Sequence, residues 1–287
     1  MSGAHPYRGA GAILTTQHGK EAAIAPALLA APGLEVRPTE GVDTDALGTF
    51  TGEIARPAPP GPTAIRKAKL GIEESGLPRA LASEGSFGPH PGAFVVAAGL
   101  ELIAFVDAER GIEIVESRLS ARTNFASRTC SDLDAETEEF LRGVGFPSHA
   151  VIARPNAGGG RADLVKGLTD PGRLGRAIAR SAGRSEDGRA RLETDMRAHL
   201  NPTRMAEIAT VADALGRRLA TLCPDCSAPG FGRLESRRGL PCSSCGTPTD
   251  RVAEEVLGCA GCGARRAAPR GDGLEAASPA SCPACNP

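Results

Sequence analysis

Aromatic side chains are scarce in this sequence, which has no Trp, one Tyr and eight Phe among its 287 residues. Because 41% of the chain is still hydrophobic, a core can form, but it has to be built mainly from Ala, Leu, Val and Ile. After residue 221 the single aromatic residue is Phe231. Nucleic-acid recognition by base stacking, which needs aromatic rings, is therefore poorly supported in that part of the chain.

An excess of charge of one sign is also missing. The formal net charge is −1 and the pI is near 6.5, which implies no bulk attraction to nucleic acid or to an anionic membrane. No apolar run approaches the roughly 20 residues of a transmembrane helix. Residues 1–9 lack the apolar core of a signal peptide. We therefore expect a cytoplasmic protein that does not associate with a membrane.

Short apolar segments alternate with helical patterns over residues 1–221. A strand over 12–16, a helix ending at Ala30 and a strand over 34–37 form a β-α-β opening, which favours parallel pairing of the two strands. Further along we expect a helix over 63–75 with Ile65, Ala68 and Ile72 facing inward, a glycine-rich turn over 83–90, and strands over 94–97, 100–107 and 111–116. The expected fold class is α/β, with a mixed sheet flanked by helices.

The segment 191–204 has the sequence RLETDMRAHLNPTR. Apolar and polar residues alternate over 191–201, the period of a half-buried strand. Asn201 and Pro202 then predict a helix start, because Asn is a preferred N-cap and Pro is tolerated at the first helical position. The expected polar strand face gathers Arg191, Glu193, Asp195, Arg197, His199 and Asn201. Such neighbours lie roughly 7 Å apart, close enough to share a metal ion or a phosphate, although a solvated strand face has the same pattern.

Eight of the nine cysteines form four Cys-x-x-Cys pairs: Cys223/Cys226, Cys242/Cys245, Cys259/Cys262 and Cys282/Cys285. Two such turns supply the four thiolates of a tetrahedral Zn²⁺ site. The spacing predicts two structural zinc sites in a small zinc-ribbon-like domain over 222–287, after the α/β domain of 1–221. Disulfides are the alternative, and a cytoplasmic location argues against them. Tandem pairing has spacers of 15 and 19 residues, close to zinc-ribbon spacing, while crossed or nested pairing stays open.

Three stretches in the first third of the chain resemble, in order, motifs of the inosine/xanthosine triphosphate pyrophosphatase-like superfamily. They are TTQHGK at 15–20, AIRKA at 64–68 and GLPRALASEGSF at 76–87. In that family a strand ends in T-x-N-x-G-K, a helix carries N-A-x-x-K-A, and the next strand ends in A-D-D-S-G-L. The resemblance covers residues 12–90. It implies an α/β fold in which the turn and Lys20 hold a triphosphate and Glu84 takes the place of a metal-binding acid. Gln17 stands where the family has Asn.

The chain as a whole, with segment 191–204 followed by the four cysteine pairs, resembles a bacterial family of uncharacterised proteins. That resemblance implies no activity. It also gives no oligomeric state.

The first functional hypothesis is a divalent-metal-dependent hydrolase of nucleotides or other phosphorylated small molecules. The candidate catalytic residues are Lys20, Glu84, Glu193, Asp195, Arg197, His199 and Arg204. The ammonium and guanidinium groups would neutralise phosphate, the carboxylates would ligate Mg²⁺ or Mn²⁺, and the imidazole or a carboxylate would act as base. The mechanism requires Glu84 to lie near the 191–201 strand.

The second hypothesis is a non-enzymatic protein whose zinc-binding tail docks on nucleic acid or on a protein partner. Residues 171–222 carry ten Arg and six Asp or Glu, a local positive excess that could meet phosphates. This hypothesis requires salt-dependent binding of RNA or DNA, or else a protein partner.

Overall fold

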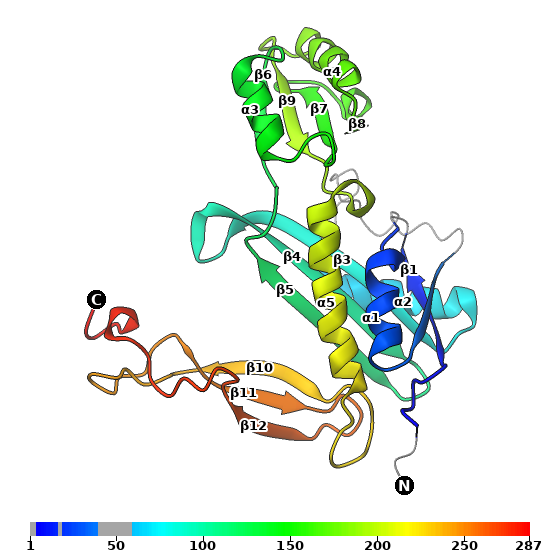
Figure 1. Ribbon diagram of the computed structural model, residues 1–287, viewed down its shortest axis with the longest axis vertical. Coiled ribbons are helices and arrows are strands. Elements are labelled where there is room, and N and C mark those ends of the chain that lie inside the picture. Colours follow the sequence, from blue (N-terminus) through cyan, green and yellow to red (C-terminus); the bar gives the residue numbers. More distant parts are fainter. Residues whose placement is uncertain (1–3, 17–18, 40–58) are drawn as a thin grey trace.

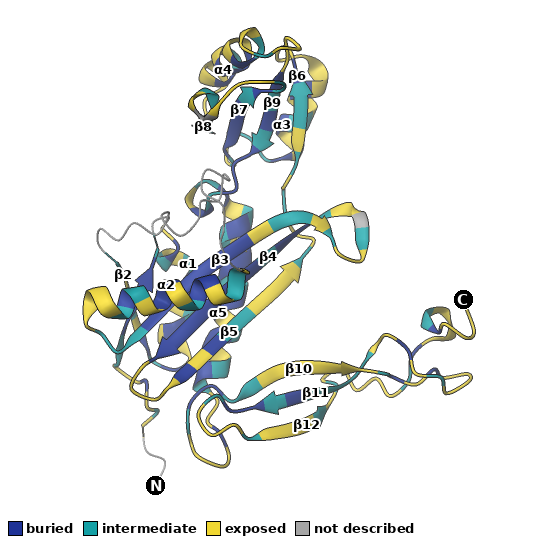
Figure 2. Cartoon of the chain, turned by 180° about the vertical axis from the view of Figure 1, so that it is seen from behind, coloured by how far each residue is buried: buried dark blue, intermediate teal, exposed yellow. Residues whose placement is uncertain are grey.

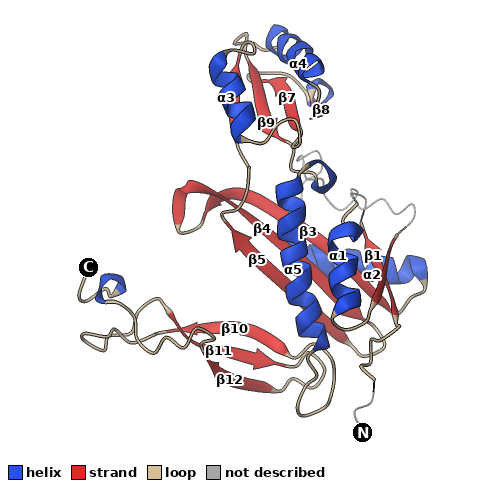
Figure 3. Cartoon of the chain, in the orientation of Figure 1, coloured by secondary structure: helices blue, strands red, loops and turns tan. Residues whose placement is uncertain are grey.

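The computed structural model describes residues 4–16, 19–39 and 59–287. Gln17 and His18 of the expected phosphate-binding turn lie outside these residues. The described chain forms a five-stranded, a four-stranded and a three-stranded sheet. They follow one another along the long axis of the molecule, with the five-stranded sheet in the middle (Figure 1). Helices flank the two larger sheets (Figure 3). Eight of the nine cysteines lie in the C-terminal part, at 223–285, so the predicted fold class is confirmed.

The five-stranded sheet has the order β2-β1-β3-β4-β5. Its strands are β1 (Gly11–Thr15), β2 (Glu35–Pro38), β3 (Arg79–His90), β4 (Ala93–Asp107) and β5 (Ile112–Ser120). Strand β1 pairs in parallel with β2, as the β-α-β opening predicts, and also with β3, whereas β3, β4 and β5 pair antiparallel.

Helices cover both faces of this sheet. Helix α1 (Glu21–Ala30) and helix α5 (Pro202–Ala220) lie side by side on one face, where Ile208 and Leu215 pack with Leu81, Ile103 and Phe105. Helix α2 (Pro60–Ser75) covers the other face with small residues. Since successive strand residues point to opposite faces, odd-numbered residues of β3 face α5 and even-numbered ones face α2. Burial is concentrated on the central strands (Figure 2).

The segment 83–90, expected to be a turn, is the second half of β3. It pairs with β4 without interruption from Ser83 opposite Ile103 to Pro89 opposite Ala97. The strands expected over 94–97 and 100–107 are likewise one strand, β4. Strand β1 ends at Thr15, opposite Ala82, so β3 continues beyond its parallel neighbour. Among the described residues, β3 has no strand beside it on that side from Ser83 onward, and Lys20, which follows β1, reaches Ser83 O there.

The four-stranded sheet belongs to a unit inserted between β5 and α5. Its order is β6-β9-β7-β8 and all its pairs are antiparallel. Its elements are β6 (Ser127–Cys130), α3 (Ala135–Gly143), β7 (Val151–Pro155), β8 (Val165–Leu168), α4 (Pro171–Gly183) and β9 (Ala190–Thr194). Val151, Leu174, Ile178 and Leu192 lie in a hydrophobic cluster of its own.

The strand expected over 191–201 is shorter, because β9 ends at Thr194. Asp195 is fully buried and its carboxylate accepts hydrogen bonds from the backbone N–H groups of Gly167 and Arg197, which breaks the alternation. A 3-10 turn, η3 (Ala198–Leu200), follows. Helix α5 then begins as predicted, with the Asn201 side chain accepting from Arg204 N at 3.0 Å.

The three-stranded sheet follows α5 and consists of β10 (Gly232–Arg238), β11 (Val252–Gly258) and β12 (Arg265–Pro269), all antiparallel. Helix α5 ends at Ala220, close to the expected boundary at 221/222; the division into two domains stays a prediction. Within the part of the chain that the structure describes, no helix combines the length and apolar character needed to cross a lipid bilayer.

Candidate functional site

Five ionisable side chains gather beside the second half of β3. We call them the charged cluster: Lys20, Lys67, Glu84, Glu101 and Arg204, each no more than 7% exposed. They come from the β1–α1 turn, α2, β3, β4 and α5. The sequence predicted Lys20, Glu84 and Arg204 as site residues and missed Lys67 and Glu101. With three cations and two carboxylates, the cluster carries one more positive than negative charge.

On the α2 face of the sheet, Lys67 Nζ lies 2.5 Å from Glu84 Oε1. Lys67 points inward because α2 packs through Ala64, Ala68 and Gly71, all buried, while Ile65 and Ile72 of the predicted face pack beside them and are partly buried. The packing is close, since a Cβ added at Gly71 would come within 2.2 Å of Thr15 Oγ1. A lysine on the same helix face as small residues was the signal in the sequence.

On the α5 face, Arg204 and Glu101 form a two-pronged ion pair, with Nε–Oε1 at 2.6 Å and Nη2–Oε2 at 3.3 Å. Glu101 lies opposite Gly85 in the strand register. A Cβ at Gly85 would come within 2.6 Å of the Arg204 guanidinium, so the glycine makes room for the pair. Arg204 Nη1 also donates to the backbone oxygen of Met196, and its guanidinium lies 5.3 Å from the centre of the Phe87 ring.

Lys20 lies between the two ion pairs. It follows β1, caps α1 through its backbone carbonyl, and donates from Nζ to Ser83 O at 2.9 Å. Burial lowers the pKa of Lys20 to about 8, and the positive charges of Arg204 and Lys67 add to this effect against the opposing influence of Glu101 and Glu84. The electrostatic coupling of Lys20 to all four other groups makes the cluster one unit.

His199 lies beside the turn that carries Lys20. A Cβ added at Gly19 would be 3.9 Å from His199 Cβ, although the two residues belong to the β1–α1 turn and to η3. Partial burial lowers the pKa of His199, the charge of Arg197 lowers it further, and Asp195 opposes the shift. The imidazole is therefore mostly neutral at pH 7 and can accept a proton.

The remaining predicted residues belong to the inserted unit. Glu193 on β9 pairs with Arg154 at 2.9 Å and with Arg191 at 2.7 Å. Asp195 pairs with Arg197 at 2.6 Å. Burial opposes the ionisation of both carboxylates, but hydrogen bonds from these arginines outweigh it and lower both pKa values.

The metal site of Glu84, Glu193 and Asp195 stays a prediction, but its residues come from different parts of the fold. Glu84 belongs to the five-stranded sheet and pairs with Lys67, whereas Glu193 belongs to the four-stranded sheet and has its own arginines. In the described residues, the groups of three or more potential metal donors that lie close together consist of cysteines. The prediction assumed one continuous strand from 191 to 201, whereas β9 ends at Thr194.

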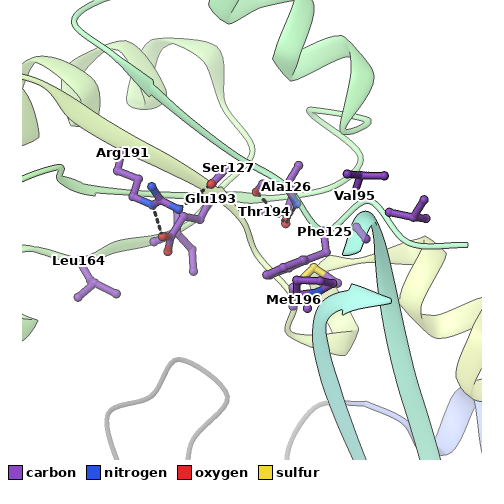
Figure 4. Close-up of a pocket in the computed structure, with 14 residues that line it drawn as sticks. Val95, Phe125, Ala126, Ser127, Leu164, Arg191, Glu193, Thr194 and Met196 are labelled. Atoms are coloured by element: carbon purple, nitrogen blue, oxygen red, sulfur yellow. Dashed lines mark hydrogen bonds and ion pairs between the residues drawn. The ribbon is translucent and has the colours of Figure 1, made fainter. Parts of the chain in front are cut away.

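A pocket of about 510 Å³ lies between the end of the β3–β4 hairpin and the four-stranded sheet. Arg191 and Glu193 line one end of it, and Phe125, Met196 and Val95 line the other (Figure 4). We call it the interunit pocket.

The cysteine pairs combine in a crossed order. One group is Cys223, Cys226, Cys259 and Cys262, and the other is Cys242, Cys245, Cys282 and Cys285. Within each group the sulfur atoms lie within 4.8 Å of one another, so each group could hold a metal ion. The strand order explains the crossing: the start of β10 and the end of β11 meet at one end of the sheet, and their other ends meet at the opposite end. Spacing alone left this choice open.

Comparison with known proteins gives one family. The family model described as "Domain of unknown function (DUF6671)" matches residues 67–287. This span includes Lys67, Glu84, Glu101, Arg204 and all eight paired cysteines. No curated protein and no solved structure matches the chain.

Proposed function

We propose that this chain, which belongs to the DUF6671 family, is a divalent-metal-dependent hydrolase of nucleotides or other phosphorylated small molecules. The observation that carries the proposal is the charged cluster, in which the described residues bring three buried cations, Lys20, Lys67 and Arg204, together with the carboxylates of Glu84 and Glu101. A phosphate group is the anion that this concentration of cations would favour, because Lys and Arg are the side chains that bind phosphate best.

The β1–α1 turn adds to the anion site. Lys20 begins α1, and the N-terminal end of a helix carries partial positive charge that favours phosphate. The resemblance of residues 12–90 to the triphosphate pyrophosphatase-like superfamily likewise implies that this turn and Lys20 hold a triphosphate. An incoming phosphate would compete with Glu84 for Lys67, because both are anions within reach of one ammonium group.

Glu84 is the residue that would hold Mg²⁺ or Mn²⁺. The donor chemistry fits, because Mg²⁺ prefers oxygen ligands and binds through one or two carboxylates together with substrate phosphates. When bound, such an ion neutralises phosphate charge and lowers the pKa of a water molecule. Glu101 is less suited, since both of its oxygens accept hydrogen bonds from Arg204. Its role is to orient that guanidinium.

His199 would act as the general base. Its lowered pKa keeps the imidazole neutral at pH 7, and its place beside Gly19 puts it next to the proposed phosphate. It would take the proton of the attacking water. Asp195 and Arg197 precede it in the chain, and their ion pair would position η3.

We further propose that the two cysteine groups hold structural zinc ions. Four thiolates complete a tetrahedral Zn²⁺ shell and leave no position for substrate. The three-stranded sheet needs such support, because β10 is exposed along almost its entire length and can contribute little to a core.

A phosphate-release screen tests the proposal. The purified chain would be incubated with Mg²⁺ or Mn²⁺, pyrophosphatase, and a panel of common and deaminated nucleoside triphosphates and other phosphorylated compounds. We expect metal-dependent turnover that Glu84→Gln abolishes and that Glu138→Gln, on the exposed face of α3, leaves unchanged. Absence of turnover on the whole panel, or equal turnover in Glu84→Gln, would overturn it.

The alternative is a non-enzymatic protein that binds nucleic acid or a protein partner through the cysteine-rich tail. The surface of that tail favours it less. Residues 222–287 contain seven Arg and seven Asp or Glu, and arginines of the sheet pair with neighbouring acids, as Arg237 does with Glu254 and Arg266 with Asp225. The tail therefore has no net positive charge with which to attract phosphates.

A further inference from the structure

The interunit pocket exposes apolar side chains to solvent. Val95 is 97% exposed, Val96 41% and Phe125 39%, and all three line the pocket. Exposed apolar side chains that gather at a concave surface are typical of ligand-binding sites. A volume of about 510 Å³ lies within the range that holds small organic ligands.

The pocket adjoins the charged cluster through two contacts. Phe125 stacks on Phe87 with ring centres 6.0 Å apart, and the Phe87 ring in turn lies under the Arg204 guanidinium. Met196 lines the pocket, and its backbone oxygen accepts a hydrogen bond from the same guanidinium. Phe87 and Met196 therefore link the wall of the pocket to Arg204, one member of the charged cluster.

The two ends of the pocket differ in chemistry. Phe125 and Met196 offer an aromatic face and a polarisable sulfur, both of which pack well against a planar ring. At the other end, Arg191 donates to Glu193 and to Ser127 Oγ. Figure 4 shows Arg191 and Glu193 paired with each other at this end of the pocket. A guanidinium can donate to carbonyl oxygens and a carboxylate can accept from ring N–H groups.

We propose that the interunit pocket binds the aromatic heterocycle of the substrate, which makes the substrate a nucleotide whose base carries a carbonyl oxygen and a ring N–H. This inference rests on the proposed function for the phosphate half of the ligand. The inserted unit and the end of the β3–β4 hairpin would contact the heterocycle and select the base. The charged cluster would hold the phosphates.

The test separates the two halves of the ligand. Calorimetric titrations of the full chain would use guanosine, inosine and uridine, which lack phosphate, and tripolyphosphate, which lacks a base. We expect at least one of the nucleosides to bind, with Val95→Asp and Glu193→Gln each weakening binding at least tenfold. Leu29→Asp is the matched control, because Leu29 is an exposed apolar residue on α1 that does not line the pocket. This variant should leave nucleoside binding unchanged.

The reciprocal variant completes the design. Lys20→Met should abolish tripolyphosphate binding and leave nucleoside binding intact, whereas Val95→Asp should do the reverse. If tripolyphosphate binds and nucleotides are hydrolysed but no nucleoside binds, the pocket inference fails and the proposed function stands. If nucleosides bind at the pocket but no phosphorylated compound is turned over, the proposed function fails instead. Nucleoside binding that both pocket variants leave unchanged also overturns the inference.

Discussion

Burial lowers the pKa of the Lys20 ammonium group to about 8, and the positive charges of Arg204 and Lys67 lower it further against the opposing effect of Glu101 and Glu84. A lysine in water has a pKa near 10.4, so Lys20 loses its charge at a pH where other lysines keep theirs. Its capacity to bind an anion should therefore depend on pH in the weakly alkaline range.

Sulfate is a suitable probe, because its own charge is constant in this range. Between pH 7 and pH 9 the charged fraction of a group with a pKa of about 8 falls roughly tenfold. We expect sulfate affinity, measured by calorimetry, to fall by a similar factor as the pH rises. Lys20→Met should bind sulfate weakly at both pH values. A wild-type affinity that is the same at pH 7 and pH 9 would contradict the role of Lys20.

Residue chemistry also explains which site residues the sequence could predict. Glu84 and Lys20 stand in motifs with a recognisable order, whereas Glu101 sits inside an apolar strand and has no motif of its own. Its partner Arg204 is 103 residues away. Pairs at such separations are decided by which strands and helices become neighbours, so local pattern cannot identify them.

Among the elements, α1 and α5 approach each other at a glycine. A Cβ at Gly216 would lie 2.8 Å from the backbone oxygen of Ala27, and backbone cannot move aside as a flexible side chain can. Figure 1 shows the two helices side by side over the sheet. This close contact fixes α5 across β4, and α5 carries Arg204 into the charged cluster.

We therefore expect Gly216→Ala to destabilise the protein by about 1–2 kcal/mol, because overpacking outweighs the gain of about 1 kcal/mol in helix propensity. Gly175 in α4 is the matched control. Its added Cβ would meet only a flexible Leu133 side chain at 3.4 Å, so Gly175→Ala should stabilise by up to about 1 kcal/mol. Urea unfolding of both variants measures the difference, and a stabilised Gly216→Ala would refute the close approach.

The sequence predicts a turn over 83–90 where the structure has the second half of β3. The packing of neighbouring elements explains the difference. Glycine normally weakens strands and marks turns, and this segment contains Gly85 and Gly88. In β3, however, Gly85 makes room for Glu101 and Arg204 on the neighbouring elements. On β4, Gly99 lies under the Phe87 ring in the same way. Gly85 and Gly99 therefore allow close packing with side chains of other elements. The residue pattern of one strand does not show which side chains pack against it.

At the scale of the whole molecule, the chain places an inserted unit between β5 and α5 and a cysteine-rich sheet after α5. The first arrangement puts the interunit pocket next to the charged cluster. The second requires that both cysteine groups draw ligands from distant parts of the tail, since Cys223 and Cys259 belong together, as do Cys242 and Cys282.

Zinc content tests this crossed pairing directly. With two four-cysteine groups per chain, Cys223→Ser combined with Cys259→Ser damages one group, and we expect one zinc ion to remain. Cys223→Ser combined with Cys242→Ser damages both, and we expect none to remain. Elemental analysis of the purified variants gives the counts. Tandem pairing would exchange the two results.

The sequence by itself determined the local elements and the type of chemistry. Periodicity gave the β-α-β opening, Asn201 and Pro202 gave the start of α5, and four Cys-x-x-Cys turns gave eight candidate metal ligands, because caps, strand alternation and ligand spacing act over a few residues. Only the tertiary structure decided which cysteine pairs combine, that Glu84 and Glu193 belong to different sheets, and that Lys67 and Glu101 join Lys20. These outcomes depend on strand order and helix packing, which join residues far apart in the chain.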